Sequence, residues 1–145
     1  MIRNRESTQS LISPYQFNPK AMIKMLVVDD ERDVEILFSQ RFRKEIKSGQ
    51  VQLNFAFNGE DALTFLHSLN PFDLVVVLSD INMPGMTGLE LLKTIKTEYK
   101  DLRVMMITAY GDENNYMNAI SIGADDFLSK PVDFTVLKEK VLGVS

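Results

Sequence analysis

The chain has 145 residues, 45% of them apolar and 25% charged, which is ordinary for a globular protein and enough for one domain with a sizeable core. Its net charge of −4 provides no basic field for nucleic acid or anionic lipid, and the absence of cysteine excludes disulfides, thiol nucleophiles and thiolate metal sites. No apolar run approaches the ~20 residues of a membrane-spanning helix and the N-terminus lacks the apolar core of a secretory signal, so we expect a cytoplasmic protein without membrane insertion.

Residues 1–21 are predicted to form an irregular extension before the fold begins. They are mostly polar, they include Pro14 and Pro19, and they show no sustained hydrophobic periodicity. Residues 22–145 contain no repeat, no low-complexity tract and no change of composition. They are therefore predicted to form a single domain.

An apolar strand and an amphipathic helix open this domain. The strand covers residues 23–28, and the helix after it is predicted to end near Gly49, a residue suited to a left-handed stop. Apolar side chains recur along the helix at helical spacing and are expected to face the sheet. They are Val34, Leu37, Phe38 and Phe42.

The next two elements are an alternating strand and a second helix. Residues 51–57 alternate apolar and polar side chains up to Phe57, the pattern of an edge strand. Asn58 and Gly59 are a turn signal, and Pro71 is predicted to end the helix that follows. The apolar stripe of this helix consists of Ala62, Phe65, Leu66 and Leu69.

Leu74–Leu78 is an unbroken apolar run rich in β-branched valine. Such a run indicates a strand buried on both faces, as in the interior of a parallel sheet. Asp80 follows it, and the chain then turns through Pro84 and Gly88 into a third helix. The side chains of that helix expected to face inward are Leu91, Leu92, Ile95 and Tyr99.

Two further strands and two helices complete the domain. Residues 102–107 form an apolar strand that ends at Thr108, and residues 126–129 form a short strand that ends at Lys130–Pro131. The helix between them is rich in asparagine, a poor helix former, and is expected to be the least stable. Asp133 is expected to cap the last helix, whose apolar side consists of Phe134, Leu137 and Val141.

This alternation of five strands with five helices predicts the α/β class, with one doubly wound parallel sheet covered on both faces. In such a sheet the carboxyl ends of the strands lie at one edge, where ligands bind. Side chains that can bind a metal ion or take part in catalysis lie at four of these ends. They are Asp29, Asp30, Asp80, Thr108 and Lys130.

These residue types suit magnesium binding and phosphoryl transfer. Three neighbouring carboxylates repel one another unless a cation lies among them, and Mg²⁺ binds a couple of carboxylates while it keeps several waters. Asp80 would be the nucleophile that accepts a phosphoryl group. The phosphoryl oxygens would be neutralised by Mg²⁺ and Lys130 and would accept a hydrogen bond from Thr108.

Each residue also has a structural interpretation. Asp29 and Asp30 would cap the following helix, and Asp80 would form an Asx turn. Thr108 would be an ordinary strand end, and Lys130 would be a surface residue. The agreement of four strand ends favours the functional interpretation over independent coincidence.

Four segments resemble the receiver domain of bacterial two-component response regulators, of the chemotaxis-regulator type, and they occur in the order found in that family. The segments are Leu26–Glu31, Ser79–Gly88, Ile107–Gly111 and Ala124–Pro131, and the resemblance extends from Lys24 to the C-terminus. It implies a flavodoxin-like (βα)5 fold and makes residues 22–145 a receiver domain.

The resemblance implies a phosphoacceptor signalling switch rather than an enzyme that acts on a separate substrate. A sensor histidine kinase or a histidine phosphotransfer protein would transfer the phosphoryl group to Asp80. Asp30 and Asp80 would coordinate Mg²⁺ directly, Asp29 through water and Asn82 through its backbone carbonyl. Lys130 would contact a phosphoryl oxygen.

The same resemblance implies a switch. Thr108 would also contact the phosphoryl group, and Phe127 occupies the aromatic position that turns inward as Thr108 moves. Asn82 and Tyr110 resemble the positions that tune the lifetime of the aspartyl phosphate in this family. The Lys130–Pro131 peptide is expected to be cis, as is common among its members.

The fourth helix, the strand at residues 126–129 and the last helix would form the output face. This face would bind a downstream effector protein or form a homodimer on activation. No helix-turn-helix or basic region follows the last helix, so we expect no direct binding of nucleic acid. If the chain is part of a longer protein, an effector domain would lie beyond Ser145.

Two other function classes fit less well. A phosphohydrolase with an aspartate nucleophile, similar to the haloacid dehalogenase class, needs a second Asp as general acid where this chain has Asn82. A flavodoxin-like FMN binder needs a Ser/Thr/Gly loop after the first strand, where residues 29–31 would repel phosphate. His67 is expected to be solvated and not to be a ligand.

Overall fold

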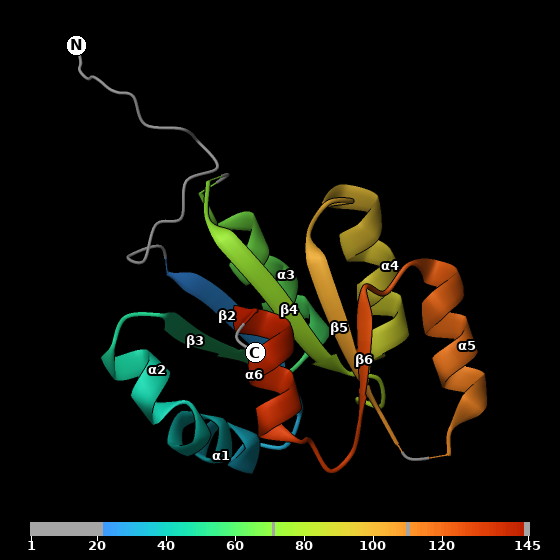
Figure 1. Ribbon diagram of the computed structural model, residues 1–145. Coiled ribbons are helices and arrows are strands. Elements are labelled where there is room, and N and C mark those ends of the chain that lie inside the picture. The colour runs from blue at the N-terminus through green and yellow to red at the C-terminus, as the bar shows by residue number, and fades with distance from the viewer. Residues whose placement is uncertain (1–21, 71, 110, 144–145) are drawn as a thin grey trace.

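A five-stranded parallel sheet forms the centre of the molecule (Figure 1). The computed structural model describes residues 22–70, 72–109 and 111–143. The strands lie in the order β3-β2-β4-β5-β6, which confirms the predicted doubly wound α/β fold and the prediction that residues 51–57 contain an edge strand. Their bounds are β2 Ile23–Val28, β3 Val51–Ala56, β4 Leu74–Asp80, β5 Arg103–Thr108 and β6 Asp126–Ser129.

Within the described part of the chain six helices accompany the sheet. They are α1 Asp33–Arg41, α2 Arg43–Lys47, α3 Gly59–His67, α4 Gly88–Glu98, α5 Glu113–Ile122 and α6 Phe134–Leu142. The prediction of five helices is wrong for the first of them, because the backbone leaves the helical region at Phe42 (φ −101°, ψ 12°). The Phe42 ring is fully buried and packs edge-on against Phe134. Among the helices described, none has the length and apolar character needed to cross a membrane.

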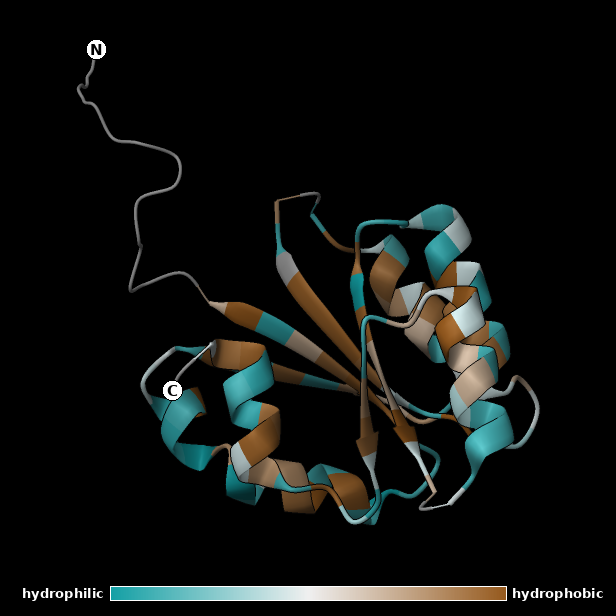
Figure 2. Cartoon of the chain, turned by 45° about the vertical axis from the view of Figure 1, so that its right-hand side comes forward, coloured by the Kyte–Doolittle hydropathy of each residue, from teal (hydrophilic) through white to brown (hydrophobic). Residues whose placement is uncertain are grey.

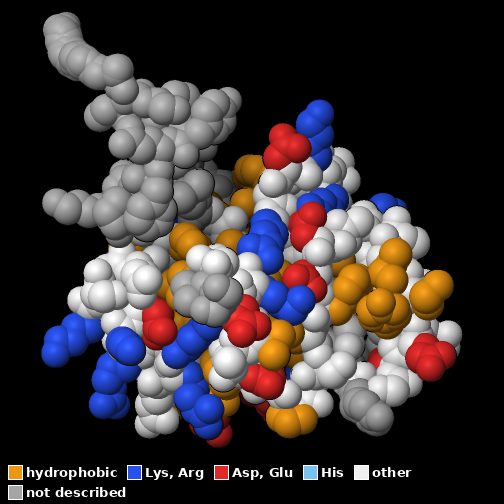
Figure 3. Space-filling model, in the orientation of Figure 1, with side chains coloured by type: hydrophobic (Ala, Val, Ile, Leu, Met, Phe, Trp, Pro, Cys, Tyr) orange, Lys and Arg blue, Asp and Glu red, His pale blue; other side chains and the backbone are white. Residues whose placement is uncertain are grey.

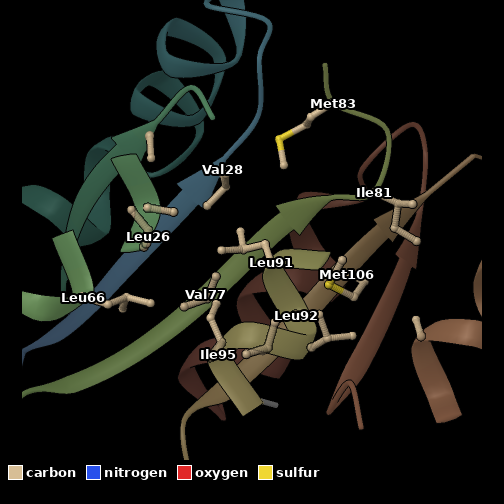
Figure 4. Close-up of a cluster of buried hydrophobic side chains, with 14 residues drawn as sticks. Leu26, Val28, Leu66, Val77, Ile81, Met83, Leu91, Leu92, Ile95 and Met106 are labelled. Carbon is tan, nitrogen blue, oxygen red and sulfur yellow. The ribbon is translucent and has the colours of Figure 1, made fainter. Parts of the chain in front are cut away.

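Each face of the sheet carries its own hydrophobic core. Helices α3, α4 and α5 cover one face, where Leu92 and Met106 belong to the cluster drawn in Figure 4. Helices α1 and α6 cover the other face, around Phe38, Phe42 and Leu137. In Figure 2 the strands are hydrophobic along most of their length, whereas hydrophilic and hydrophobic residues alternate along the helices. The central strands are therefore buried on both faces, as predicted.

The apolar stripes predicted for α3, α4 and α6 are confirmed, and Asp133 caps α6 by accepting hydrogen bonds from the Thr135 and Val136 amides. The buried members of these stripes are Ala62, Leu66, Leu91, Leu92, Ile95, Phe134, Leu137 and Val141. The partly buried members are Phe65, Leu69 and Tyr99.

One predicted inward position is wrong, one residue of a predicted strand lies outside that strand, and one prediction lies outside the described residues. Leu37 is 39% exposed, because it lies about 100° round α1 from the buried Phe38. Phe57 lies beyond the end of β3, and its ring contacts the Arg32 guanidinium instead. Pro71, predicted to end the second helix, is not among the described residues.

Asp126 at the start of β6 links this edge strand to α6. Its carboxylate accepts hydrogen bonds from the Lys140 ammonium at 2.9 and 3.0 Å, and the Arg103 guanidinium lies 3.9 Å away. Burial alone would raise the pKa of Asp126. The hydrogen bonds from Lys140 and the Phe127 amide, together with the two positive charges, outweigh burial and lower this pKa below its usual range.

We expect this site to make the stability of the protein sensitive to acid. The contribution of the ionised Asp126 to the free energy of unfolding is complete above 3.8, the pKa of an ordinary aspartate. It is lost as the pH falls through the lower pKa that Asp126 has in the folded protein. Asp126→Asn should remove this part of the acid dependence, which urea unfolding at a series of pH values measures. Asp101→Asn, at an exposed carboxylate, is the control and should keep the wild-type profile. An unchanged profile in Asp126→Asn would contradict the prediction.

Candidate functional site

The carboxyl edge of the sheet brings together the five side chains predicted to form a site. Asp29 is the first residue after β2, Asp80 and Thr108 are the last residues of β4 and β5, and Lys130 follows directly after β6. Asp29, Asp80 and Thr108 are almost fully buried, with exposed fractions of 5%, 3% and 5%. Asp30 and Lys130 are exposed at the rim. The parallel topology therefore builds a site that is buried at its base and open to solvent.

Three carboxylates form a compact acidic cluster at this edge. Asp29, Asp30 and Asp80 each place a carboxylate oxygen within 4.8 Å of the others. Burial raises the pKa of Asp29 and the charge of Asp80 adds to this effect, whereas the Glu31 amide opposes it by donating a 2.9 Å hydrogen bond to Asp29. The cluster thus brings three acidic groups together, two of them almost fully buried. Its oxygen donors suit a hard divalent cation such as Mg²⁺.

Lys130 supplies positive charge beside Asp80. Its ammonium donates a 2.9 Å hydrogen bond to Asp80 Oδ2, and the Asn82 amide donates a 3.3 Å hydrogen bond to Oδ1. Burial alone would lower the pKa of Lys130, but the hydrogen bond to Asp80 and the charge of Asp80 raise it above its usual range. The Lys130 amide donates to the Thr108 carbonyl at 2.9 Å, and the Lys130–Pro131 peptide is cis. These contacts hold the ammonium against the buried carboxylate.

The turn after Asp80 depends on glycine at position 88. The Gly88 amide donates a 2.8 Å hydrogen bond to the Ile81 carbonyl. A Cβ atom on Gly88 would overlap the carbonyl oxygen of Asp80 and would lie 2.6 Å from the Ile81 Cα. Thr87 and Glu90 close a capping box at the start of α4. The backbone that carries Asp80 is therefore packed directly against the start of this helix.

A family model described as "Response regulator receiver domain" matches residues 25–142 of the chain. The chain belongs to this family. The four sequence segments that resemble receiver domains all lie within the matched residues. The four strand ends that carry the candidate site lie within them as well.

Three known proteins show how this receiver domain relates to others. It is 39% identical over 120 residues to the response regulator protein PilR of Pseudomonas aeruginosa, which covers 81% of this chain and 25% of PilR. It is 38% identical over 126 residues to the chemotaxis protein CheY of the same species, which covers 82% of this chain and 93% of CheY. Its structure resembles that of the response regulator protein TrrA from Thermotoga maritima in complex with Mg²⁺-BeF, with a TM-score of 0.70, 34% identity and coverage of 84% of this chain and 98% of TrrA. The chain therefore spans a quarter of the length of PilR and nearly all of CheY.

Two aromatic contacts of the receiver domain were not among the predictions made from the sequence. The Tyr116 ring of α5 lies 4.7 Å from the Phe127 ring, centroid to centroid, and Tyr116 lines a hollow of about 320 Å³ together with Thr108. The Arg32 guanidinium lies 4.1 Å above the centre of the Phe57 ring. A large aromatic residue in an asparagine-rich helix is a sequence signal for the first contact. No sequence signal indicates the second.

The remaining predicted residues of the receiver domain occupy varied environments. Phe127 is partly buried beside the core beneath α5, and Asn82 is exposed. Tyr110 lies outside the described residues. The His67 side chain is 58% exposed and lies 3.1 Å from Glu98, which agrees with its prediction as a solvated residue.

Proposed function

We propose that this receiver domain is a phosphoacceptor switch that takes a phosphoryl group onto Asp80 from a sensor histidine kinase or a histidine phosphotransfer protein. The observation that supports this most strongly is the environment of the Asp80 carboxylate. It is almost fully buried, it accepts a hydrogen bond from Lys130, and it belongs to a cluster with Asp29 and Asp30. A carboxylate held between a cation and two other carboxylates at the open edge of the sheet suits a nucleophile better than a purely structural ion pair.

In the transfer, a carboxylate oxygen of Asp80 forms a bond to phosphorus while the bond from phosphorus to the donor's imidazole nitrogen breaks. The electron pair of that bond stays with the nitrogen. The charge on the phosphoryl oxygens would be met by the Lys130 ammonium and by a hydrogen bond from the Thr108 hydroxyl. When bound, Mg²⁺ would neutralise the carboxylates and one phosphoryl oxygen. The residues that would hold the ion are Asp29, Asp30, Asp80 and, through its backbone carbonyl, Asn82.

The phosphorylated state would be transmitted through the surface formed by α5, β6 and α6. Thr108 would move toward the phosphoryl group, and Phe127 would turn inward. Apolar side chains are exposed on α5, where Tyr116, Met117 and Ile120 have exposed fractions of 41%, 60% and 44%, and a hydrophobic patch is visible on this side of the molecule in Figure 3. Such a patch suits a protein partner, which would be a downstream effector or a second copy of the chain.

Several further assignments complete the proposal. Asn82 and Tyr110 would tune the lifetime of the aspartyl phosphate. Residues 22–145 would form the receiver domain after an N-terminal extension of residues 1–21. The protein would act in the cytoplasm as a signalling module and would process no substrate other than its own phosphoryl group.

The test is modification of the full chain by acetyl phosphate, followed by intact-mass measurement and by peptide mapping after borohydride reduction of the acyl phosphate. We expect a single phosphoryl group on Asp80, formed with Mg²⁺ and absent after chelation with EDTA. The proposal would be overturned if the folded protein remained unmodified in the presence of Mg²⁺, or if the phosphoryl group were found on another residue.

A further inference from the structure

Arg32 and Phe57 join two turns at the same edge of the sheet as Asp80. Arg32 lies in the turn between β2 and α1, two residues after Asp30, and Phe57 lies in the turn between β3 and α3. The carbon at the centre of the Arg32 guanidinium is 4.1 Å from the centre of the Phe57 ring. This distance is typical of a cation–π contact. The contact restrains a long and otherwise flexible cation in a turn at the edge of the sheet that carries Asp80.

The cation–π contact does not in itself use the N–H donors of Arg32. The guanidinium group presents five such donors in a planar fork that matches the geometry of a phosphate group. Arg32 also makes no side-chain capping hydrogen bond at the start of α1. A planar donor group of this kind is the one that proteins use to bind phosphate in a defined orientation.

Negatively charged side chains surround Arg32 in its turn. Asp30 and Glu31 are exposed in the same turn, and Asp30 forms the acidic cluster with the buried Asp29 and Asp80. An anionic phosphodonor that approaches Asp80 would meet these negative charges at the rim. A positive charge held at the rim would offset the repulsion and attract the donor.

We propose that Arg32, held in place by Phe57, is a positioning residue that binds the anionic phosphoryl group of the incoming donor and favours donors of higher negative charge. This proposal rests on the proposed phosphoacceptor function and deepens it. Arg32 forms no bond to phosphorus and is distinct from Lys130, which contacts Asp80 itself.

The test compares two small donors. Acetyl phosphate is a dianion near neutral pH, whereas phosphoramidate carries less negative charge. With Mg²⁺ present, Arg32→Gln should slow phosphorylation by acetyl phosphate by about fivefold, the effect of one charge pair in contact in water. It should slow phosphorylation by phosphoramidate only about twofold, because the free energy of attraction scales with the charge of the donor and is halved for a donor with half the charge. The rate with acetyl phosphate should also depend less on salt in the variant than in the wild type.

Three variants serve as controls in the same assay. Arg32→Lys keeps the charge but loses the planar donor group, and Phe57→Leu loses the ring that restrains it, so both should give intermediate rates with acetyl phosphate. Arg43→Gln makes the same charge change on α2, outside the turn that carries Arg32, and should keep wild-type rates with both donors.

The outcomes separate this inference from the function on which it rests. If neither donor modifies the wild type, the phosphoacceptor function itself is overturned. If the wild type is modified and Arg32→Gln keeps the wild-type ratio of the two rates, only the role of Arg32 is overturned. An equal loss with both donors, together with a lower unfolding temperature, would make the contact a structural clamp and would also overturn that role.

Discussion

Replacing Asp80 with asparagine is expected to slow phosphorylation by acetyl phosphate more than about 1000-fold, because a neutral amide does not supply the oxygen nucleophile. Asparagine has nearly the shape of aspartate, so the turn held by Gly88 should persist. The substitution also removes one of three carboxylates within 4.8 Å of one another, which relieves their mutual repulsion. The fold should therefore survive while the reaction is lost. Time courses of phosphorylation by intact-mass measurement, with circular dichroism as the check on folding, test this expectation.

The control for this experiment is Asp101→Asn, which makes the same change at an exposed carboxylate before β5. It should be phosphorylated at the wild-type rate. A folded Asp80→Asn protein that is modified as fast as the wild type would mean that the nucleophile is another residue. Asp29 and Asp30, the other members of the acidic cluster, would then be the candidates.

Gly88→Ala is expected to destabilise the protein by about 3 kcal/mol or more, at the upper end of overpacking substitutions. The new Cβ would overlap the Asp80 carbonyl oxygen and lie 2.6 Å from the Ile81 Cα. Both of these atoms belong to the backbone, so no side-chain rotation relieves the overlap. The backbone must shift at Asp80 itself, and the reaction should therefore slow along with the loss of stability. Urea unfolding and acetyl phosphate labelling measure the two effects.

Gly49→Ala is the matched control for this substitution. Gly49 has a φ of +82°, and a Cβ atom at this position would have no neighbouring atom within 4 Å, so alanine there should cost only about 1 kcal/mol for the left-handed conformation. Phosphorylation should be unaffected, because Gly49 lies between α2 and β3, away from Asp80. Equal losses of stability in the two variants would show that the close approach at Gly88 is unimportant.

Hydrophobic periodicity was sufficient to predict nearly every strand and helix. It succeeded for β4 and α4 because their apolar residues are buried by neighbours on the expected faces. It failed at Leu37, which is exposed, whereas Phe42 is buried as predicted. It also did not predict that the first helix is divided in two at Phe42, where the backbone leaves the helical region. The apolar spacing continues across this break, so the local sequence carries no periodic signal for it.

The order of residues along the chain is enough to predict which side chains gather at the site. Parallel strands joined by helices must end at one edge, so residues that follow strands, such as Asp29 and Asp80, are brought together by topology alone. Which of them touch depends on the packing in three dimensions. The Lys130 ammonium lies 2.9 Å from Asp80, which is 50 positions away in the chain, and the Arg32 guanidinium lies over the Phe57 ring of a different turn. These pairings depend on how the helices pack against the sheet and how each turn is held, and a pattern of residue types along one chain does not contain those distances.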